Sequence, residues 1–178
     1  MTALLIALYL LSITLANVVT AAIAPVALGA LFVPAGSFLI GVTFILRDLV
    51  QRAVGRRNTY IAIASAMVLS AITSYLLGDT MWIVFASAIT FLVSETTDTE
   101  IYTRLKLSLA KRVLFSGTVG SIIDSVLFVV IGLSPLGAGM LTWDAVGFAI
   151  TGQIIVKLIM QALGAGVVSA ALSSRKAQ

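Results

Sequence analysis

Six long apolar stretches, separated by short polar segments, constrain this chain more than any other feature of its sequence. They cover residues 3–23, 36–51, 59–77, 81–103, 113–133 and 144–172. About 20 helical residues span the hydrocarbon layer of a membrane, and each stretch meets this length approximately. With a mean hydropathy of +1.15 and 10% charged residues, the chain has too little polar surface for a soluble globule. The sequence therefore predicts an all-α integral membrane protein, with six transmembrane helices in a single domain over residues 1–178.

The residue types that are missing exclude several classes of function. There is no cysteine and no histidine, so disulfides, thiolate metal sites and a histidine base are ruled out. The sequence also has no nucleophile with a base beside it and no phosphate-binding loop of the Walker type. We expect no metal, no cofactor and no enzymatic activity.

The basic residues are gathered in a few segments, which explains the net charge of +4 without nucleic acid as a partner. Ten of the eleven lie between the second and third stretches, between the fourth and fifth, or at the end of the chain: Arg47, Arg52, Arg56, Arg57, Arg104, Lys106, Lys111, Arg112, Arg175 and Lys176. The alternate segments, 23–35, 78–80 and 134–142, have none. Under the positive-inside rule, both termini of this multi-pass protein lie on the cytoplasmic side of the inner membrane.

Four ionisable residues lie well inside the apolar stretches, away from their ends: Glu95, Asp98, Asp124 and Lys157. A charge at mid-bilayer costs at least about 2.5 kcal/mol, so such residues usually face a bundle interior and handle an ion, a proton or a polar substrate. The uncharged run Met81–Ser94 has only 14 residues, too few to cross the membrane, so Glu95 and Asp98 must enter it. The alternative for this pair is that it marks the cytoplasmic end of a short helix.

The last two apolar stretches also carry polar and charged residues that are candidates for the interior of the bundle. Asp124 lies near the middle of its stretch, and Gln153, Lys157 and Gln161 recur every four residues, which makes one polar stripe on a helix. A purely structural Asp124–Lys157 salt bridge is the alternative interpretation. Three carboxylates against one lysine leave two negative charges uncompensated, so we hypothesise that one carboxylate exchanges a proton during turnover. Asn17 adds an amide in the first stretch, although such residues often only join helices.

The approach to the second stretch is punctuated by Pro25, Gly29, Pro34 and Gly36. These residues predict an irregular external segment, which is either a lid over a cavity or an ordinary loop. Asp48, at the other end of the same stretch, is a candidate gate together with Arg47. In this hypothesis Asp48 forms an ion pair with Arg52 or Arg56 that breaks when the inner side opens.

The order and spacing of several motifs resemble the queuosine-precursor transporters, also called the vitamin uptake transporter family. The motifs are Ala16-Asn17, the segment 34–55 with Arg47-Asp48 and Ala53-Val54-Gly55, the runs 97–105 and 120–128, and Lys157. This chain departs from the family pattern at Arg47, where the family usually has threonine, and near Ser121, where it often has asparagine.

The resemblance implies import of a 7-deazaguanine, such as 7-cyano-7-deazaguanine, by a secondary carrier. A guanine-like edge offers two neighbouring N–H donors, which a carboxylate of Glu95, Asp98 or Asp124 could accept, and a carbonyl for Asn17, Gln153 or Lys157. Candidates for stacking on the flat base, or for simple packing, are Phe38, Phe91, Tyr102 and Phe128.

A second class of function also fits six helices of this length. The substrate-binding subunit of an energy-coupling-factor importer binds a vitamin but cannot transport it alone. Ala3 and Ala7 form a small-residue face on the first stretch that could dock on a partner subunit. The sequence is also compatible with a homo-oligomer.

Overall fold

The computed structural model describes residues 2–29 and 31–176, with the side chains of residues 32, 168, 169 and 171–176 left out. In chain order its elements are α1 (Thr2–Ala22), β1 (Val26–Leu28), β2 (Leu31–Val33), α2 (Ser37–Leu76), α3 (Met81–Arg104), α4 (Leu109–Leu127), the π-helical turn η1 (Phe128–Leu133) and α5 (Trp143–Lys176). The described chain is thus helical apart from one small hairpin, as the sequence predicts.

Four helices of the described chain are long and apolar enough to cross a membrane: Thr2–Ala22, Ser37–Leu76, Leu109–Leu133 and Trp143–Val167. Helix α3 is not among them, because its second half carries Glu95, Asp98 and Glu100. Its start is nevertheless well defined, since the Thr80 hydroxyl caps the helix by accepting a hydrogen bond from the Ile83 N–H at 3.3 Å.

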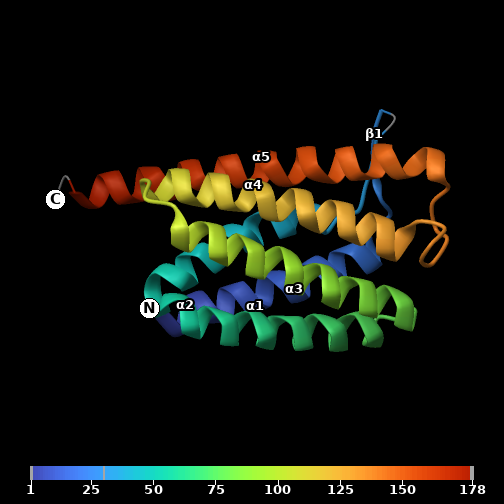
Figure 1. Ribbon diagram of the computed structural model, residues 1–178, viewed down its shortest axis with the longest axis horizontal. Helices are drawn as coiled ribbons and strands as arrows, with labels where there is room; N and C mark the ends of the chain where they lie inside the picture. The colour runs from blue at the N-terminus through green and yellow to red at the C-terminus, as the bar shows by residue number, and fades with distance from the viewer. Residues whose placement is uncertain (1, 30, 177–178) are drawn as a thin grey trace.

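Helix α2 is two helical arms joined at Gly55. This glycine has φ 78° and ψ 168°, a conformation that is essentially restricted to glycine. The chain folds back at this point (Figure 1), so Val50 of the first arm shares a core cluster with Ala62 and Ile63 of the second. The arms correspond to the predicted stretches 36–51 and 59–77, and with the other helices they make six helical rods.

The rods run side by side, and the Gly55 bend lies at the same end of the bundle as the start of α1 and the end of α5 (Figure 1). Exposed basic residues flank this bend and the α3–α4 connection: Arg52, Arg56, Arg57, Arg104, Lys106 and Lys111. The side chains of Arg175 and Lys176 lie outside the described residues. Arg47 is an exception that corrects the sequence analysis: it is 0% exposed and does not belong to this basic surface.

The segment before α2 is more regular than expected. Strands β1 and β2 pair antiparallel, with Val26 opposite Val33 and Leu28 opposite Leu31. The hairpin lies at the end of the bundle opposite the Gly55 bend (Figure 1). Val33 is fully buried, and β2 packs against α5. The expected irregular segment is therefore a short β-hairpin attached to the bundle.

Candidate functional site

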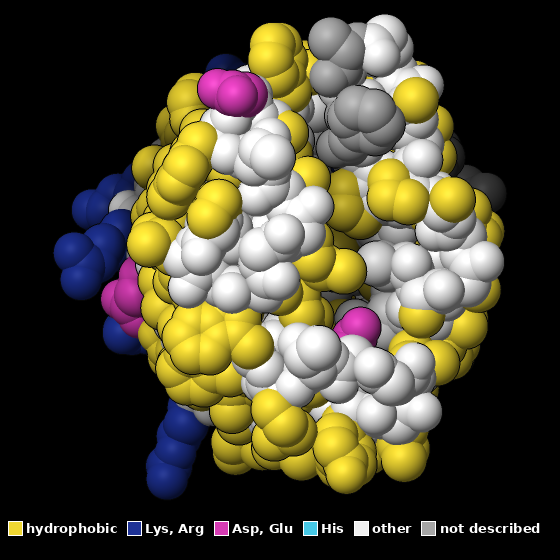
Figure 2. Space-filling view, turned by 90° about the vertical axis from the view of Figure 1, so that its right-hand side faces the viewer, with side chains coloured by type: hydrophobic (Ala, Val, Ile, Leu, Met, Phe, Trp, Pro, Cys, Tyr) yellow, Lys and Arg dark blue, Asp and Glu magenta, His cyan; other side chains and the backbone are white. Residues whose placement is uncertain are grey.

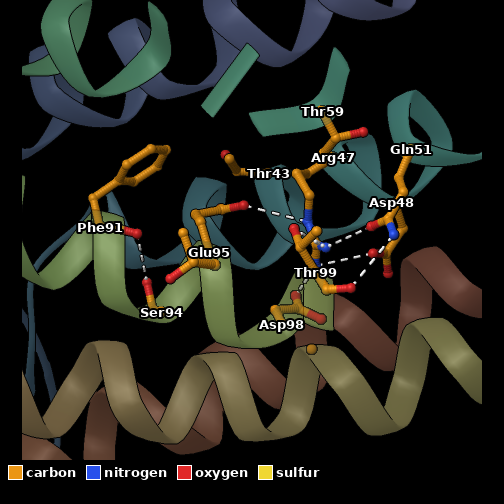
Figure 3. A network of polar contacts seen from close by, with 12 residues as sticks. Thr43, Arg47, Asp48, Gln51, Thr59, Phe91, Ser94, Glu95, Asp98 and Thr99 are labelled. Carbon is orange, nitrogen blue, oxygen red and sulfur yellow. Dashed lines mark hydrogen bonds and ion pairs between the residues drawn. The ribbon is translucent and has the colours of Figure 1, made fainter. Parts of the chain in front are cut away.

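A guanidinium surrounded by carboxylates lies at the centre of the bundle (Figure 3). Arg47 of α2 has Nη2 at 2.9 Å from Asp48 Oδ1 and Nε at 3.3 Å from Glu95 Oε2. The same Nη2 also forms an ion pair with Asp98 Oδ2. All four side chains are at most 2% exposed. This Arg47 cluster therefore joins α2 to α3 through charges that water does not reach.

Neutral side chains hold the remaining edge of the Arg47 guanidinium. Its Nη1 donates to Gln51 Oε1 at 3.2 Å and to Thr99 Oγ1 at 3.0 Å. Gln51 in turn donates to Thr103 Oγ1 at 2.8 Å. The sequence analysis missed Gln51 and Thr99, although Thr43, Arg47 and Gln51 recur every four residues and so lie on one face of a helix.

A second charged group, the Lys157 cluster, lies between α4 and α5. Lys157 Nζ donates to Asp124 Oδ2 at 2.5 Å, to Ser125 Oγ at 2.9 Å and to Gln153 Oε1 at 3.0 Å. The lysine side chain is 2% exposed and the aspartate 15%, which makes Asp124 the most accessible carboxylate of the two clusters. The ion pair weighed as an alternative in the sequence analysis is thus present in the structure.

The stripe on α5 faces inward over its whole length. Gln153, Lys157 and Gln161 are at most 2% exposed. Gln161 donates to the Gly117 carbonyl and to Ser121 Oγ, both at 2.9 Å. Inward orientation of this stripe, predicted from its spacing, is confirmed.

The two clusters are neighbours, connected through α3. Ser94, which directly precedes Glu95, donates to Asp124 Oδ1 at 3.4 Å. One turn further along the same face of α3, Gly120 of α4 allows a close approach, because a Cβ atom there would lie 3.2 Å from Asp98 Cβ. The clusters therefore form one polar layer that crosses the bundle from α2 through α3 to α4 and α5.

This layer carries an excess of negative charge. Four carboxylates face two cations, so two negative charges are uncompensated if every group is ionised. The three carboxylates and one lysine identified from the sequence leave the same excess, because Arg47 and Asp48 add one charge of each sign. A layer of this kind would hold a cation, protons or a ligand rich in N–H donors.

Asp48 does not form the ion pair expected for it. It is 0% exposed and lies beside Arg47, whereas Arg56 is at the surface and pairs with Glu100. The reason is that α2 continues in helical form beyond Asp48 as far as the bend at Gly55, which keeps Asp48 inside the bundle. The predicted Asp48 pair with Arg52 or Arg56 is therefore wrong for this conformation.

The remaining predicted residues lie outside both clusters. Asn17 donates to the carbonyl and hydroxyl of Ser70, at 3.1 and 2.9 Å, and so joins α1 to the second arm of α2. Phe91 belongs to an apolar core cluster, and the Tyr102 ring lies under the Arg112 guanidinium at 4.5 Å. Phe38 and Phe128 are half-buried.

The bundle is hollowed at the β-hairpin end. Figure 2 looks onto this end and shows hydrophobic side chains around the periphery and a hollow in which acidic side-chain atoms are visible. A shallow depression of about 430 Å³ at the same end is lined by Leu31, Asp144, Gly147, Phe148 and Thr151. The bundle is thus indented at the end that carries the β-hairpin.

Buried charges that compensate one another inside a bundle of apolar helices define a class, the multi-pass membrane proteins that handle polar solutes. Within that class, the chain belongs to the family described as "Putative vitamin uptake transporter", whose model matches residues 34–171. The match covers both charged clusters, and it confirms the resemblance found from the motifs. Comparisons with curated proteins and with solved structures gave no match. Transporters of this type usually lie in the inner membrane.

Proposed function

We propose that the protein imports a 7-deazaguanine, such as 7-cyano-7-deazaguanine, across the cytoplasmic membrane as a proton-coupled secondary carrier. In this proposal the six helical rods are six spans of one transport domain, with both ends of the chain in the cytoplasm. The vitamin uptake transporter family and the motifs quoted from the sequence support it. The exposed basic residues at the Gly55 end agree with the orientation.

One observation carries the choice of ligand: a buried acceptor and a buried donor with spare capacity lie in neighbouring clusters. Glu95 Oε2 has an ion contact to Arg47 at 3.3 Å, and the Glu95 carboxylate also interacts with the hydroxyl of the buried Tyr9. Among the described residues, the Gln153 Nε2 group has no hydrogen-bond partner. Unpaired buried polar groups are costly unless a ligand or water satisfies them. A guanine-like edge, with two adjacent N–H donors and one carbonyl, complements both groups.

The role of each group follows from this complementarity. The Glu95 carboxylate would accept from the ring N1–H and the exocyclic amine, with Asp98 beside it on the same face of α3. Gln153 would donate to the carbonyl, held in place through its own oxygen by Lys157 at 3.0 Å. The half-buried rings of Phe38 and Phe128 stay candidates for stacking on the base, and Asn17 acts as a joint between helices.

Proton coupling is proposed from the charge balance. Two uncompensated negative charges in the membrane interior would cost several kcal/mol, since each isolated charge costs at least about 2.5 kcal/mol there. A proton taken up with the substrate removes part of this cost. Asp124 is the best candidate for the proton-exchanging group, because at 15% exposure it is the most accessible carboxylate of the two clusters.

The test measures uptake of labelled 7-cyano-7-deazaguanine, read out as queuosine in tRNA, in cells that cannot synthesise this base. The chain is expressed alone, and its Asp124→Asn variant is compared with Asp79→Asn, the same change at an exposed site. We expect uptake by the wild type and by Asp79→Asn, loss in Asp124→Asn, and loss of wild-type uptake when an uncoupler is added.

Each of the following outcomes would contradict part of the proposal. Uptake that an uncoupler does not affect would contradict proton coupling. A wild-type chain that binds the base when purified but does not import it would favour the binding subunit of an energy-coupling-factor importer. A wild-type chain that does neither would refute the proposed substrate.

A further inference from the structure

The acceptor proposed for the substrate is already occupied in this structure by a side chain of the protein itself. Arg47 directs Nε to Glu95 at 3.3 Å and Nη2 to Asp98. A guanidinium is a planar group whose N–H donors form a fork, and the N1–C2–N2 edge of a guanine-like base is a planar fork of the same type. The carboxylates of α3 therefore hold an internal group with the donor pattern of the proposed ligand.

Arg47 can release Glu95 without losing every partner. Its Nη2 lies 2.9 Å from Asp48, and its Nη1 is held by Gln51 and Thr99 at 3.2 and 3.0 Å. Among the described residues, the contact to Glu95 is the longest of the three ion contacts of Arg47 and the only one of them made through Nε. A small movement away from α3 would break this contact and leave the cation paired with Asp48 and hydrogen-bonded to Gln51, which both belong to α2.

We propose that Arg47 is an internal substitute for the substrate, which occupies Glu95 in the empty carrier and is displaced from it when the substrate binds. This inference rests on the proposed function and names a further specificity-determining residue of the same site.

The empty carrier needs such a substitute. Net uptake requires the carrier to return without substrate after each release, whereas exchange of external for internal substrate uses only loaded carriers. Without Arg47, the empty carrier would return with Glu95 at 1% exposure and without its counter-charge, and a buried charge that lacks a counter-charge is strongly unfavourable. The loaded carrier has the donors of the substrate instead.

The test separates the two modes of transport in proteoliposomes. Purified wild type, Arg47→Gln and Arg56→Gln are compared for net uptake of labelled 7-cyano-7-deazaguanine and for its exchange against unlabelled base inside. Arg56 is the matched control, an arginine of the same helix that is 53% exposed and pairs with Glu100. In Arg47→Gln we expect net uptake to fall by about tenfold or more, which equals about 1.4 kcal/mol on the return step, and exchange to stay within about twofold. Arg56→Gln should keep both.

A second variant and a binding measurement guard against simple misfolding. Arg47→Lys keeps a positive charge for Asp98 but has no Nε donor for Glu95, so it should also lose net uptake more than exchange. Both variants should bind the base at least as tightly as the wild type, because they lack the guanidinium that competes with the base for Glu95.

Equal loss, or equal retention, of net uptake and exchange in both Arg47 variants would overturn the inference, as would weaker binding. Failure of the proposed function is a different result, in which the wild type itself shows neither mode of transport.

Discussion

Neutralising Asp124 removes the one charged partner that the Lys157 ammonium has among the described residues. In Asp124→Asn the lysine keeps hydrogen bonds to Ser125 and Gln153, at 2.9 and 3.0 Å, but these partners carry no charge. The Lys157 side chain is 2% exposed, so water cannot replace the lost carboxylate. The reverse change, Lys157→Met, leaves an aspartate that is 15% exposed and can be partly hydrated. The structure therefore predicts that Asp124→Asn is the more destabilising of the two.

The size of the expected loss of stability follows from the burial of the Asp124–Lys157 pair. Removing one partner of a buried ion pair typically costs about 3–5 kcal/mol. The lower end applies here, because the aspartate is 15% exposed and two neutral groups still hold the lysine. For a chain of this size, each kcal/mol shifts the melting temperature by about 2–4 °C, so we expect a decrease of about 6–12 °C for Asp124→Asn. The double variant, with both changes, should recover most of this loss, because no buried charge remains.

The assay is thermal unfolding of purified protein in detergent, followed by the fluorescence of Trp82 and Trp143. Wild type, both single variants and the double variant form a double-mutant cycle, with an expected coupling energy of about 2–3 kcal/mol. Single variants that each melt within about 2 °C of the wild type would refute the argument that this pair is buried and mutually compensating.

Three further predictions test the packing around the polar layer. Gly55→Ala should lower the free energy of unfolding by about 1–3 kcal/mol, because alanine is strained at φ 78° and ψ 168°; an unchanged melting temperature would mean that the bend is not as described. Gly120→Val should cost about 1–3 kcal/mol by overpacking against Asp98 and should slow uptake, and a variant with normal stability and uptake would contradict the close approach. Asn17→Leu should cost about 1 kcal/mol through its lost bonds to Ser70 and leave uptake unchanged, whereas lost uptake in a stable variant would make Asn17 a binding residue.

The helical architecture was predictable because hydropathy is summed over about 20 residues and does not depend on long-range contacts. The inward stripe on α5 was predictable for a related reason, since a spacing of four residues places Gln153, Lys157 and Gln161 on one face whatever they contact. The spacing of residues along one helix does not show which side chains on different helices contact one another. The Asp124–Lys157 ion pair could therefore be predicted only as one of two interpretations.

Arg47 shows where the reasoning from sequence failed. It was counted with the cytoplasmic basic residues because it lies near them along the chain, yet the first arm of α2 runs on to Gly55 and keeps Arg47 inside the bundle. The sequence feature that indicates its burial is the spacing of the polar residues Thr43, Arg47 and Gln51, which recur every four residues like the polar stripe on α5. The carboxylates that stabilise the buried arginine come from α3, and only the fold brings them to it.

The weak hydropathy of α3 has a consequence for how the protein reaches the membrane during synthesis. This helix is absent from those apolar enough to cross by themselves, so an isolated α3 would be poorly retained in the lipid as it leaves the translocon. Arg47 belongs to α2 and is synthesised first, so the cation that pairs with Glu95 and Asp98 is already present when α3 emerges. Insertion of α3 should then depend on α2, with the two helices entering the bilayer as a pair.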